Sequence, residues 1–113
     1  MKQHISNEQL KVLSWEEQKK IATIFGQFGN CSRNDANGDE YLILPMLAEK
    51  ITIGKMIEVI TKDNITVDIK TTTLDTEDGK KAFILLNNIF NVKSYSSEEL
   101  CDALWEAVKE IVN

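Results

Sequence analysis

Histidine and cysteine, two residue types that commonly serve as catalytic base and nucleophile, are scarce in this chain of 113 residues. His4 is the only histidine, and it lies near the N-terminus, where a frayed chain end would not hold a catalytic geometry. Cys31 stands two positions before Arg33, whose charge could lower the pKa of the thiol and activate it. The polar surroundings favour a plain loop cysteine instead, one that could be exposed. We therefore predict no catalytic residue and no enzymatic activity.

Two groups of acidic residues raise the question of carboxylate chemistry. From Asp35 onward, oxygen-bearing side chains stand at positions 1, 3 and 5, as in an EF-hand loop. That loop also requires Gly at position 6 and Glu at position 12, where this chain has Glu40 and Met46. An ordinary Asn/Asp/Gly turn is therefore predicted. The second group would lie at a solvated hairpin tip, not in the cleft that catalytic carboxylates need. Its members are Asp75, Glu77 and Asp78.

Metal and cofactor motifs of the common kinds are also missing from the sequence. The two cysteines, Cys31 and Cys101, form no CxxC pair, and one histidine cannot complete a four-ligand zinc site. Gly26 and Gly29 lack the GK[ST] ending of a phosphate-binding loop. We expect no metal and no cofactor. Both cysteines should be free thiols in a reducing compartment, with Cys101 in the core.

The overall composition is that of an acidic globular domain. Hydrophobic residues make up 42% and charged residues 27% of the chain, and its formal net charge is -5. Residues 1–113 are therefore expected to fold as a single domain. An acidic chain lacks the clustered cations that bind a phosphate backbone, so direct nucleic-acid binding is not expected. No apolar run approaches the roughly 20 residues of a membrane span. The N-terminus also lacks the apolar segment of a secretory signal, which predicts a soluble cytoplasmic protein.

The N-terminal third predicts two helices and a loop. Serine followed three residues later by Glu or Gln marks a helix start, because the hydroxyl accepts a free backbone N–H group. Ser6 and Ser14 have this pattern and predict helices at about 7–13 and 15–27, followed by a polar loop at 29–40. The second helix has a one-sided apolar pattern. That pattern consists of Ile21, Ile24, Phe25 and Phe28.

The next segments predict a short strand and a further helix. The apolar run 41–44 would be a buried strand that Pro45 ends, because proline cannot donate to a ladder. Thr52 would cap a helix that runs to about residue 61. Four apolar residues would share one face of it: Ile53, Met56, Ile57 and Ile60.

A hairpin is predicted after this helix. Residues 65–71 alternate apolar and polar with β-branched side chains, which is typical of a half-buried strand. The Asp-Gly pair within 77–80 predicts a turn, and 82–86 would be the returning strand. The apolar run 82–92 leaves the alternative of a buried helix open.

An amphipathic helix is predicted at the C-terminus, with Ser96 as its cap and Val112 near its end. Trp105 on its flank, and Trp15 in the second helix, are both expected in the core, although a tryptophan can also be a binding hot spot. The apolar stripe of this last helix consists of Leu100, Ala103, Leu104, Ala107, Val108 and Ile111. Its outer face would be acidic, formed by Glu98, Glu99, Asp102, Glu106 and Glu110.

These elements predict an α+β fold: N-terminal helices, a small mainly antiparallel sheet, and a C-terminal helix packed on the sheet. Three stretches resemble one family. Residues 44–60 are similar to an LPLL-(T/S)IGQMIE-LL pattern, 99–109 to an ELxDALWEAVK ending, and 9–18 to the opening. Together they cover roughly a third of the chain and resemble short uncharacterised proteins of phages and prophages from low-GC Gram-positive bacteria. Lys55 replaces the usual Gln, and an insertion follows Leu47. The resemblance implies a phage accessory role and brings no catalytic residue.

The function predicted on these grounds is stoichiometric binding of a host or phage protein. Inhibition of a host defence or regulatory protein, as by an anti-CRISPR, is one concrete version. The acidic outer face of the C-terminal helix is the predicted partner-binding surface. Two alternatives stay open. A protein that binds or sequesters a small ligand would show an Ile-lined pocket of some ~300 Å³ or more. A small virion assembly protein would show a symmetric interface, so a homo-oligomer is possible.

Overall fold

The computed structural model describes residues 2–62, 65–73, 80–87, 92–97 and 99–112. The α+β prediction is confirmed, with the C-terminal helix packed on the sheet region. The first elements are α1 (Asn7–Lys11), α2 (Trp15–Ile24), α3 (Phe28–Cys31), β1 (Ser32–Asn34), β2 (Glu40–Leu42) and α4 (Leu44–Lys50). They are followed by α5 (Ile53–Thr61), β3 (Thr66–Thr73), β4 (Lys80–Asn87), β5 (Val92–Ser97) and α6 (Leu100–Val112).

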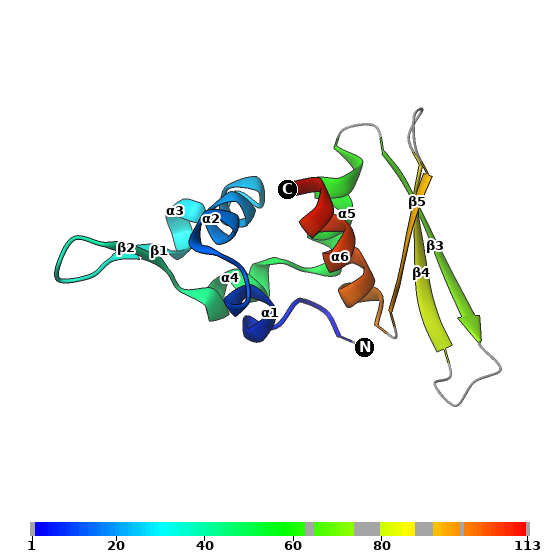
Figure 1. Cartoon of the computed structure of the whole chain (residues 1–113), viewed down its shortest axis with the longest axis horizontal. Coiled ribbons are helices and arrows are strands. Elements are labelled where there is room, and N and C mark those ends of the chain that lie inside the picture. Colours follow the sequence, from blue (N-terminus) through cyan, green and yellow to red (C-terminus); the bar gives the residue numbers. More distant parts are fainter. Residues whose placement is uncertain (1, 63–64, 74–79, 88–91, 98, 113) are drawn as a thin grey trace.

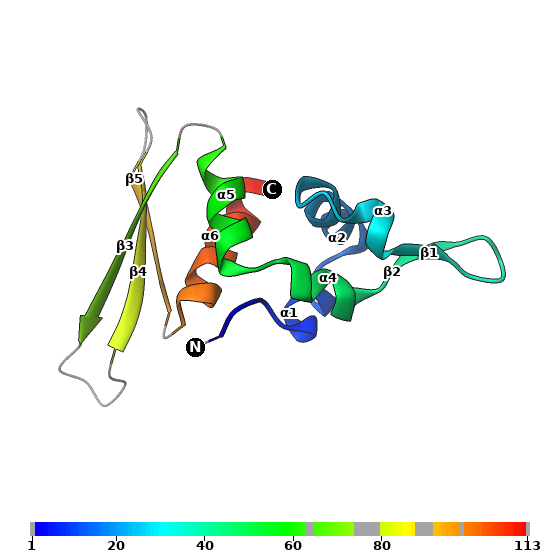
Figure 2. The same cartoon turned by 180° about the vertical axis from the view of Figure 1, so that it is seen from behind.

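Figures 1 and 2 show the elements from two opposite sides. Helices α5 and α6 lie side by side in the middle of the molecule. The sheet of β3, β4 and β5 lies against one side of this pair, and α1 to α4 lie on the other side. The β1–β2 hairpin projects from the end that is farthest from the sheet. The molecule is accordingly elongated, with principal extents of 54 × 35 × 20 Å.

The N-terminal helices begin where the sequence predicts them. Ser6 and Ser14 each accept the backbone N–H three residues on, and both capping boxes are complete. Helix α2 ends at Ile24, three residues before the predicted end, because Gly26 adopts a left-handed φ of 68°. The Gln27 N–H then bonds to the Ala22 carbonyl at 2.8 Å, and Gly26 N–H to Thr23 at 3.0 Å. This pattern closes a helix with a left-handed glycine.

The predicted polar loop at 29–40 is wrong in part, because α3 and β1 occupy its first half. Strand β1 pairs antiparallel with β2, from Ser32 opposite Leu42 to Asn34 opposite Glu40. The role predicted for Pro45 is also wrong. Pro45 lies in the first turn of α4, where a helix needs no backbone N–H from it. The strand before it therefore ends at Leu42, and Leu44 is helical.

The three-stranded sheet contains the predicted hairpin. β3 and β4 pair antiparallel from Thr66 opposite Asn87 to Thr73 opposite Lys80, so 82–87 is strand. The turn predicted within 77–80 falls mainly outside the described residues. Strand β5 has no counterpart in the sequence predictions. Ser96 lies in this strand opposite Phe83 of β4 and does not cap a helix, so the third predicted capping box is wrong. Helix α6 begins only at Leu100.

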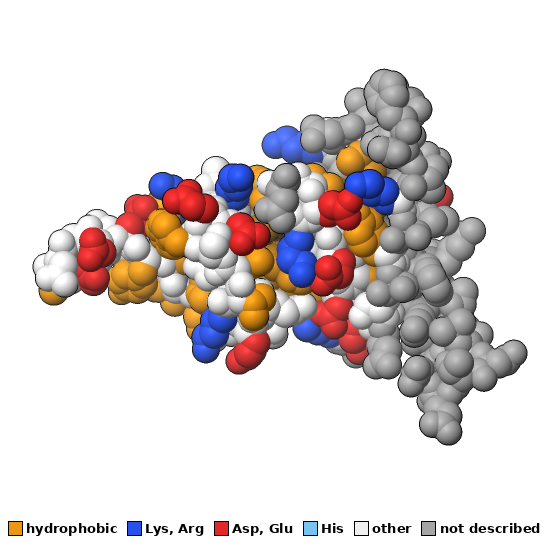
Figure 3. Space-filling model, viewed as in Figure 1, with side chains coloured by type: hydrophobic (Ala, Val, Ile, Leu, Met, Phe, Trp, Pro, Cys, Tyr) orange, Lys and Arg blue, Asp and Glu red, His pale blue; other side chains and the backbone are white. Residues whose placement is uncertain are grey.

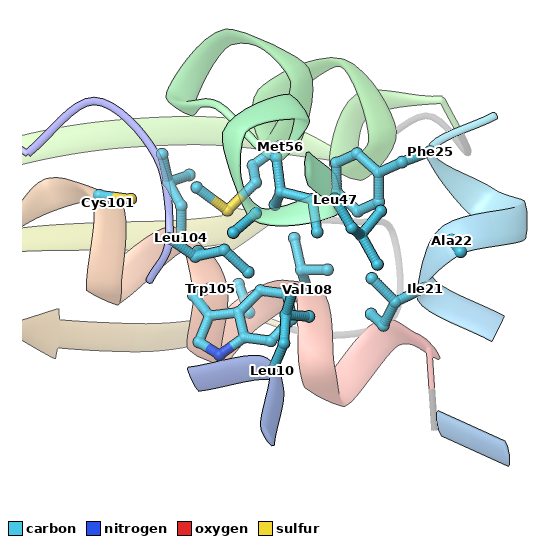
Figure 4. Packing of buried hydrophobic residues seen from close by; sticks show 14 of the residues in the cluster. Leu10, Ile21, Ala22, Phe25, Leu47, Met56, Cys101, Leu104, Trp105 and Val108 are labelled. Atoms are coloured by element: carbon cyan, nitrogen blue, oxygen red, sulfur yellow. The ribbon is translucent and has the colours of Figure 1, made fainter. Parts of the chain in front are cut away.

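The core forms where α6 packs against helices from both halves of the chain. Figure 4 shows Leu104, Trp105 and Val108 of α6 among side chains of α1, α2, α4 and α5. Trp105 is 1% exposed, as predicted, whereas Trp15 is 37% exposed, so its predicted place in the core is wrong. Among the described residues, no helix has the length and apolar character needed to cross a membrane. The core thus joins the N-terminal helices to the helix pair that carries the sheet.

Candidate functional site

The acidic face predicted on the C-terminal helix is only partly free. Asp102 accepts hydrogen bonds from Lys2 Nζ at 2.7 Å and from Gln9 Nε2 at 3.0 Å. The same Lys2 Nζ donates to Gln9 Oε1 at 2.8 Å, and the Lys2 backbone N–H donates to Glu99 at 3.3 Å. These contacts tie the N-terminal segment to α6. Glu98 of this face lies outside the described residues.

The far end of the acidic face is also occupied by the chain itself. Glu106 pairs with Lys109 at 2.9 Å, and Glu110 accepts hydrogen bonds from Lys93 and Tyr95 of β5. These two donors hold the pKa of the Glu110 carboxyl below its usual value. Burial, and then the hydrogen bond to Glu110, raise the pKa of Tyr95. Figure 3 accordingly shows acidic and basic side chains interspersed over the described part of one molecular face.

The described residues with chemically reactive side chains, His4 and the two cysteines, belong to three different segments: the N-terminal segment, α3 and α6. Cys31 is 1% exposed at the end of α3, so the prediction of an exposable loop cysteine is wrong, and burial raises the pKa of its thiol. Cys101 is fully buried, as predicted. His4 is exposed but not frayed: it forms a β-bridge with Thr52, and its Nδ1 lies 2.7 Å from the Ile5 carbonyl oxygen. The short N-terminal segment is therefore anchored.

The carboxylate segments show no metal-like grouping in the part of the chain that the structure describes. Asp35 instead organises the turn between β1 and β2. Its Oδ1 accepts the backbone N–H groups of Asn37 at 2.8 Å and Asp39 at 3.0 Å, and Gly38 has a φ of 81°. This is the ordinary Asn/Asp/Gly turn predicted for the segment. The second acidic group, Asp75, Glu77 and Asp78, lies outside the described residues.

A groove that no sequence pattern predicted is lined by residues at the ends of α2, α5 and α6. Figure 1 shows these three helix ends near one another. We call this groove the three-helix groove. It has a volume of about 360 Å³ and is lined by Thr23, Ile24, Val59, Lys62, Ile111 and Val112. Ile24 is 44% exposed and Ile111 37% exposed. Both were predicted as members of core stripes, so the apolar faces of α2 and α6 extend beyond the core into this groove.

Lysines lie along the edge of the groove. A second depression of about 280 Å³ shares Thr23 and Ile24 with it and runs along α2, where Lys19, Lys20 and Glu16 line it. Lys19 Nζ lies 5.7 Å from the centre of the Phe28 ring, which attracts a cation. In the described parts of the chain, neither Lys20 nor Lys62 takes part in an ion pair. The groove therefore places exposed aliphatic side chains beside Lys62, and the adjoining depression adds Lys19, Lys20 and Glu16.

The comparisons with known proteins add no family to these observations. No family model matches the chain, and neither the curated proteins nor the solved structures contain a match.

Proposed function

We propose that this chain binds one partner protein stoichiometrically, and that the three-helix groove receives an acidic amphipathic segment of that partner. The observation that carries the proposal is the exposure of Ile24 and Ile111 in a groove that Lys62 lines, with Lys20 in the adjoining depression. Burying aliphatic surface supplies affinity, and unpaired lysines select a partner with carboxylates beside its apolar face. A helix laid into a groove has this combination of apolar and charged faces.

The biological setting is proposed on the family resemblance alone. It favours a phage accessory protein in the cytoplasm of the host cell, with inhibition of a host defence or regulatory protein as the concrete version. The proposed action is binding and involves no catalysis. The acidic face of α6 is a weaker candidate for the interface than the groove, because Asp102, Glu106 and Glu110 are each paired with a lysine of the same chain.

The test begins with a pull-down from a lysate of a low-GC Gram-positive host, followed by mass spectrometry. Affinity for the purified partner is then measured with Ile24→Glu and Ile111→Glu. Each should weaken binding roughly tenfold or more, because a charge replaces apolar surface at the centre of the contact. Val12→Glu is the matched control, since Val12, directly after α1, is 81% exposed and does not line the groove. Binding that tolerates both groove variants as well as the control would contradict the proposal.

The lysines are tested separately. Lys20→Glu combined with Lys62→Glu should slow association and flatten its dependence on salt, because long-range attraction is lost. Lys11→Glu on α1 is the control for charge reversal away from the groove. If the partner segment is basic and the lysine variants bind it faster, the acidic character proposed for it is wrong.

A small-molecule ligand is the second candidate, and the groove volume favours it. A groove of about 360 Å³, lined by two isoleucines, two valines, Thr23 and Lys62, lies within the size range of ligand pockets. The expected ligand would be an amphipathic anion, for the same reason as the acidic segment. Native mass spectrometry of protein purified from the host would show a bound small molecule, and Ile24→Glu would remove it. A protein that carries no small molecule under these conditions would leave protein binding as the function.

A further inference from the structure

In the described residues both edges of the three-stranded sheet lack a partner strand, and β3 is the longer of the two edge strands. β3 is eight residues long and pairs with β4 along its whole length. In the described residues the sheet order is β3-β4-β5, so no strand pairs with the other edge of β3. The strand contains no proline, which would remove a donor from that edge. Its outward N–H and C=O groups are therefore a template for a further strand.

The centre of this edge strand carries the features of a contact surface. Ile69 is 42% exposed, so a large aliphatic side chain offers apolar surface in this edge strand. Asp68 is exposed beside it, and Lys70 follows in the sequence. When two copies of this segment pair antiparallel about a two-fold axis at the isoleucine, the acid of each copy lies opposite the base of the other. The segment is therefore complementary to itself.

We propose that two copies of this chain associate edge to edge through β3, antiparallel, with Ile69 of one protomer opposite Ile69 of its partner. The two sheets then form one continuous sheet across the dimer. A two-fold axis perpendicular to the sheet relates the protomers, so each contact occurs twice. Because both copies supply the same open edge, the free backbone N–H and C=O groups of one β3 pair with those of the other.

Charge complementarity selects this register. Residues directly opposite each other in an antiparallel pair share one face of the sheet, so the axis must pass through a residue position. An axis at position 68 would place Asp68 opposite Asp68, and an axis at position 70 would place Lys70 opposite Lys70. With the axis at Ile69, Asp68 of each protomer lies opposite Lys70 of the other. Of the three registers, with the axis at position 68, 69 or 70, only the register at position 69 avoids a like-charge pair and forms two opposite-charge pairs.

The charges provide a sharp test by sedimentation equilibrium. The wild-type chain should dimerise, and Asp68→Lys or Lys70→Asp should each weaken the dimer roughly tenfold or more, because two like-charge pairs arise. An equal mixture of the two variants should form a heterodimer near wild-type affinity, since opposite charges face each other again. Asp39→Lys in the β1–β2 turn is the control for an exposed charge change. Circular dichroism verifies that each variant is folded.

A cross-link tests the register independently of charge. Facing positions of antiparallel strands have Cα atoms about 4.5 to 5.5 Å apart, a separation that a disulfide can span. Ile69→Cys should therefore form a covalent dimer on mild oxidation with diamide, whereas Tyr41→Cys, which is exposed on the other hairpin, should not. The native cysteines are both buried. A monomeric wild-type chain, or a dimer that the charge variants leave intact, would overturn the proposal. Efficient cross-linking through Asp68→Cys in place of Ile69→Cys would overturn the register.

Discussion

The two cysteine side chains are buried in the core, Cys31 in α3 and Cys101 in α6. Cys31 is 1% exposed and Cys101 0% exposed. Burial raises the pKa of both thiols, that of Cys101 to about 11. Arg33 acts in the opposite direction on Cys31, but burial is the larger effect. Proximity in the sequence to a cation therefore does not make this thiol reactive, because the thiolate would have to form in an apolar environment.

We expect neither thiol of the folded protein to react with dithionitrobenzoate at pH 8. Reaction should begin only when denaturant unfolds the chain, and both thiols should then titrate together. The absorbance of the released thiolate, followed with and without urea, measures this. Rapid labelling of Cys31 in native buffer would show that the end of α3 opens in solution.

Leu104 and Glu106 test the orientation of α6 at single residues. Leu104 is fully buried among core side chains, so Leu104→Ala should destabilise the fold by roughly 2–5 kcal/mol. Glu106 is exposed, and its pair with Lys109 is a surface pair within one helix. Glu106→Ala should therefore change the free energy of unfolding by less than ~0.5 kcal/mol. Urea denaturation compares the two variants, and equal effects would contradict the assigned helix faces.

At the scale of the elements, α6 and β5 are joined through one carboxylate. Glu110 of the helix accepts hydrogen bonds from Lys93 and Tyr95 of the strand. The pKa of Glu110 is lowered by this contact, and the pKa of Tyr95 is raised above its ordinary value of 10.0. A carboxyl pKa that is lower in the folded state than in the unfolded state stabilises the fold, and this stability is lost as the pH falls through the folded-state pKa. A raised tyrosine pKa adds stability that is lost as the pH rises above the ordinary value.

We therefore expect the link to stabilise the protein between these limits and to weaken on both sides. The free energy of unfolding of wild type minus that of Tyr95→Phe should be constant at neutral pH and should fall as the pH rises above 10.0. On the acid side, the difference between wild type and Glu110→Gln should shrink below the ordinary carboxyl value of 4.5. Tyr41→Phe, at an exposed position of β2, serves as the control. If the difference in the free energy of unfolding between wild type and Tyr95→Phe stays constant above pH 10.0, the proposed contribution of the Tyr95–Glu110 hydrogen bond is wrong.

Element starts were predictable where the signal is local. The capping boxes at Ser6 and Ser14 use hydrogen bonds within four residues, so the sequence contains the whole motif. The same pattern at Ser96 failed, because antiparallel pairing of β5 with β4 places this residue in a strand. Pro45 failed for a related reason: proline suits both a strand end and a first helical turn, and only the surrounding fold decides.

At the scale of the whole molecule, the groove and the ion pair between Lys2 and Asp102 depend on segments far apart in the sequence. The groove needs the ends of α2, α5 and α6 at one place, which no periodicity predicts. The acidic surplus of α6 was counted locally, yet Lys2 reaches Asp102 across 100 residues. Counting charges within the C-terminal helix alone therefore overestimated the unpaired negative charge on the outer face of α6. The fold class, by contrast, follows from the local patterns of the longer elements α2, α5, β3 and α6, although β5 and the short elements α3 and β1 had no readable pattern.

The groove requires an acidic partner segment, whereas the acidic face of α6 requires a basic partner surface. Charge-reversal variants of the two surfaces can therefore distinguish them. Glu99, Asp102 and Glu106 changed together to Lys should lower stability, because Lys2 and Gln9 lose their acceptor on α6. Under conditions where circular dichroism shows the variant folded, we expect an unchanged association rate with the purified partner. The combined Lys20→Glu and Lys62→Glu variant should associate more slowly, with a weaker salt dependence. Stopped-flow measurements at low and high salt provide both values. The reverse result, slow association of the α6 variant alone, would identify the acidic face as the interface and exclude the groove, since a basic partner surface would then be required.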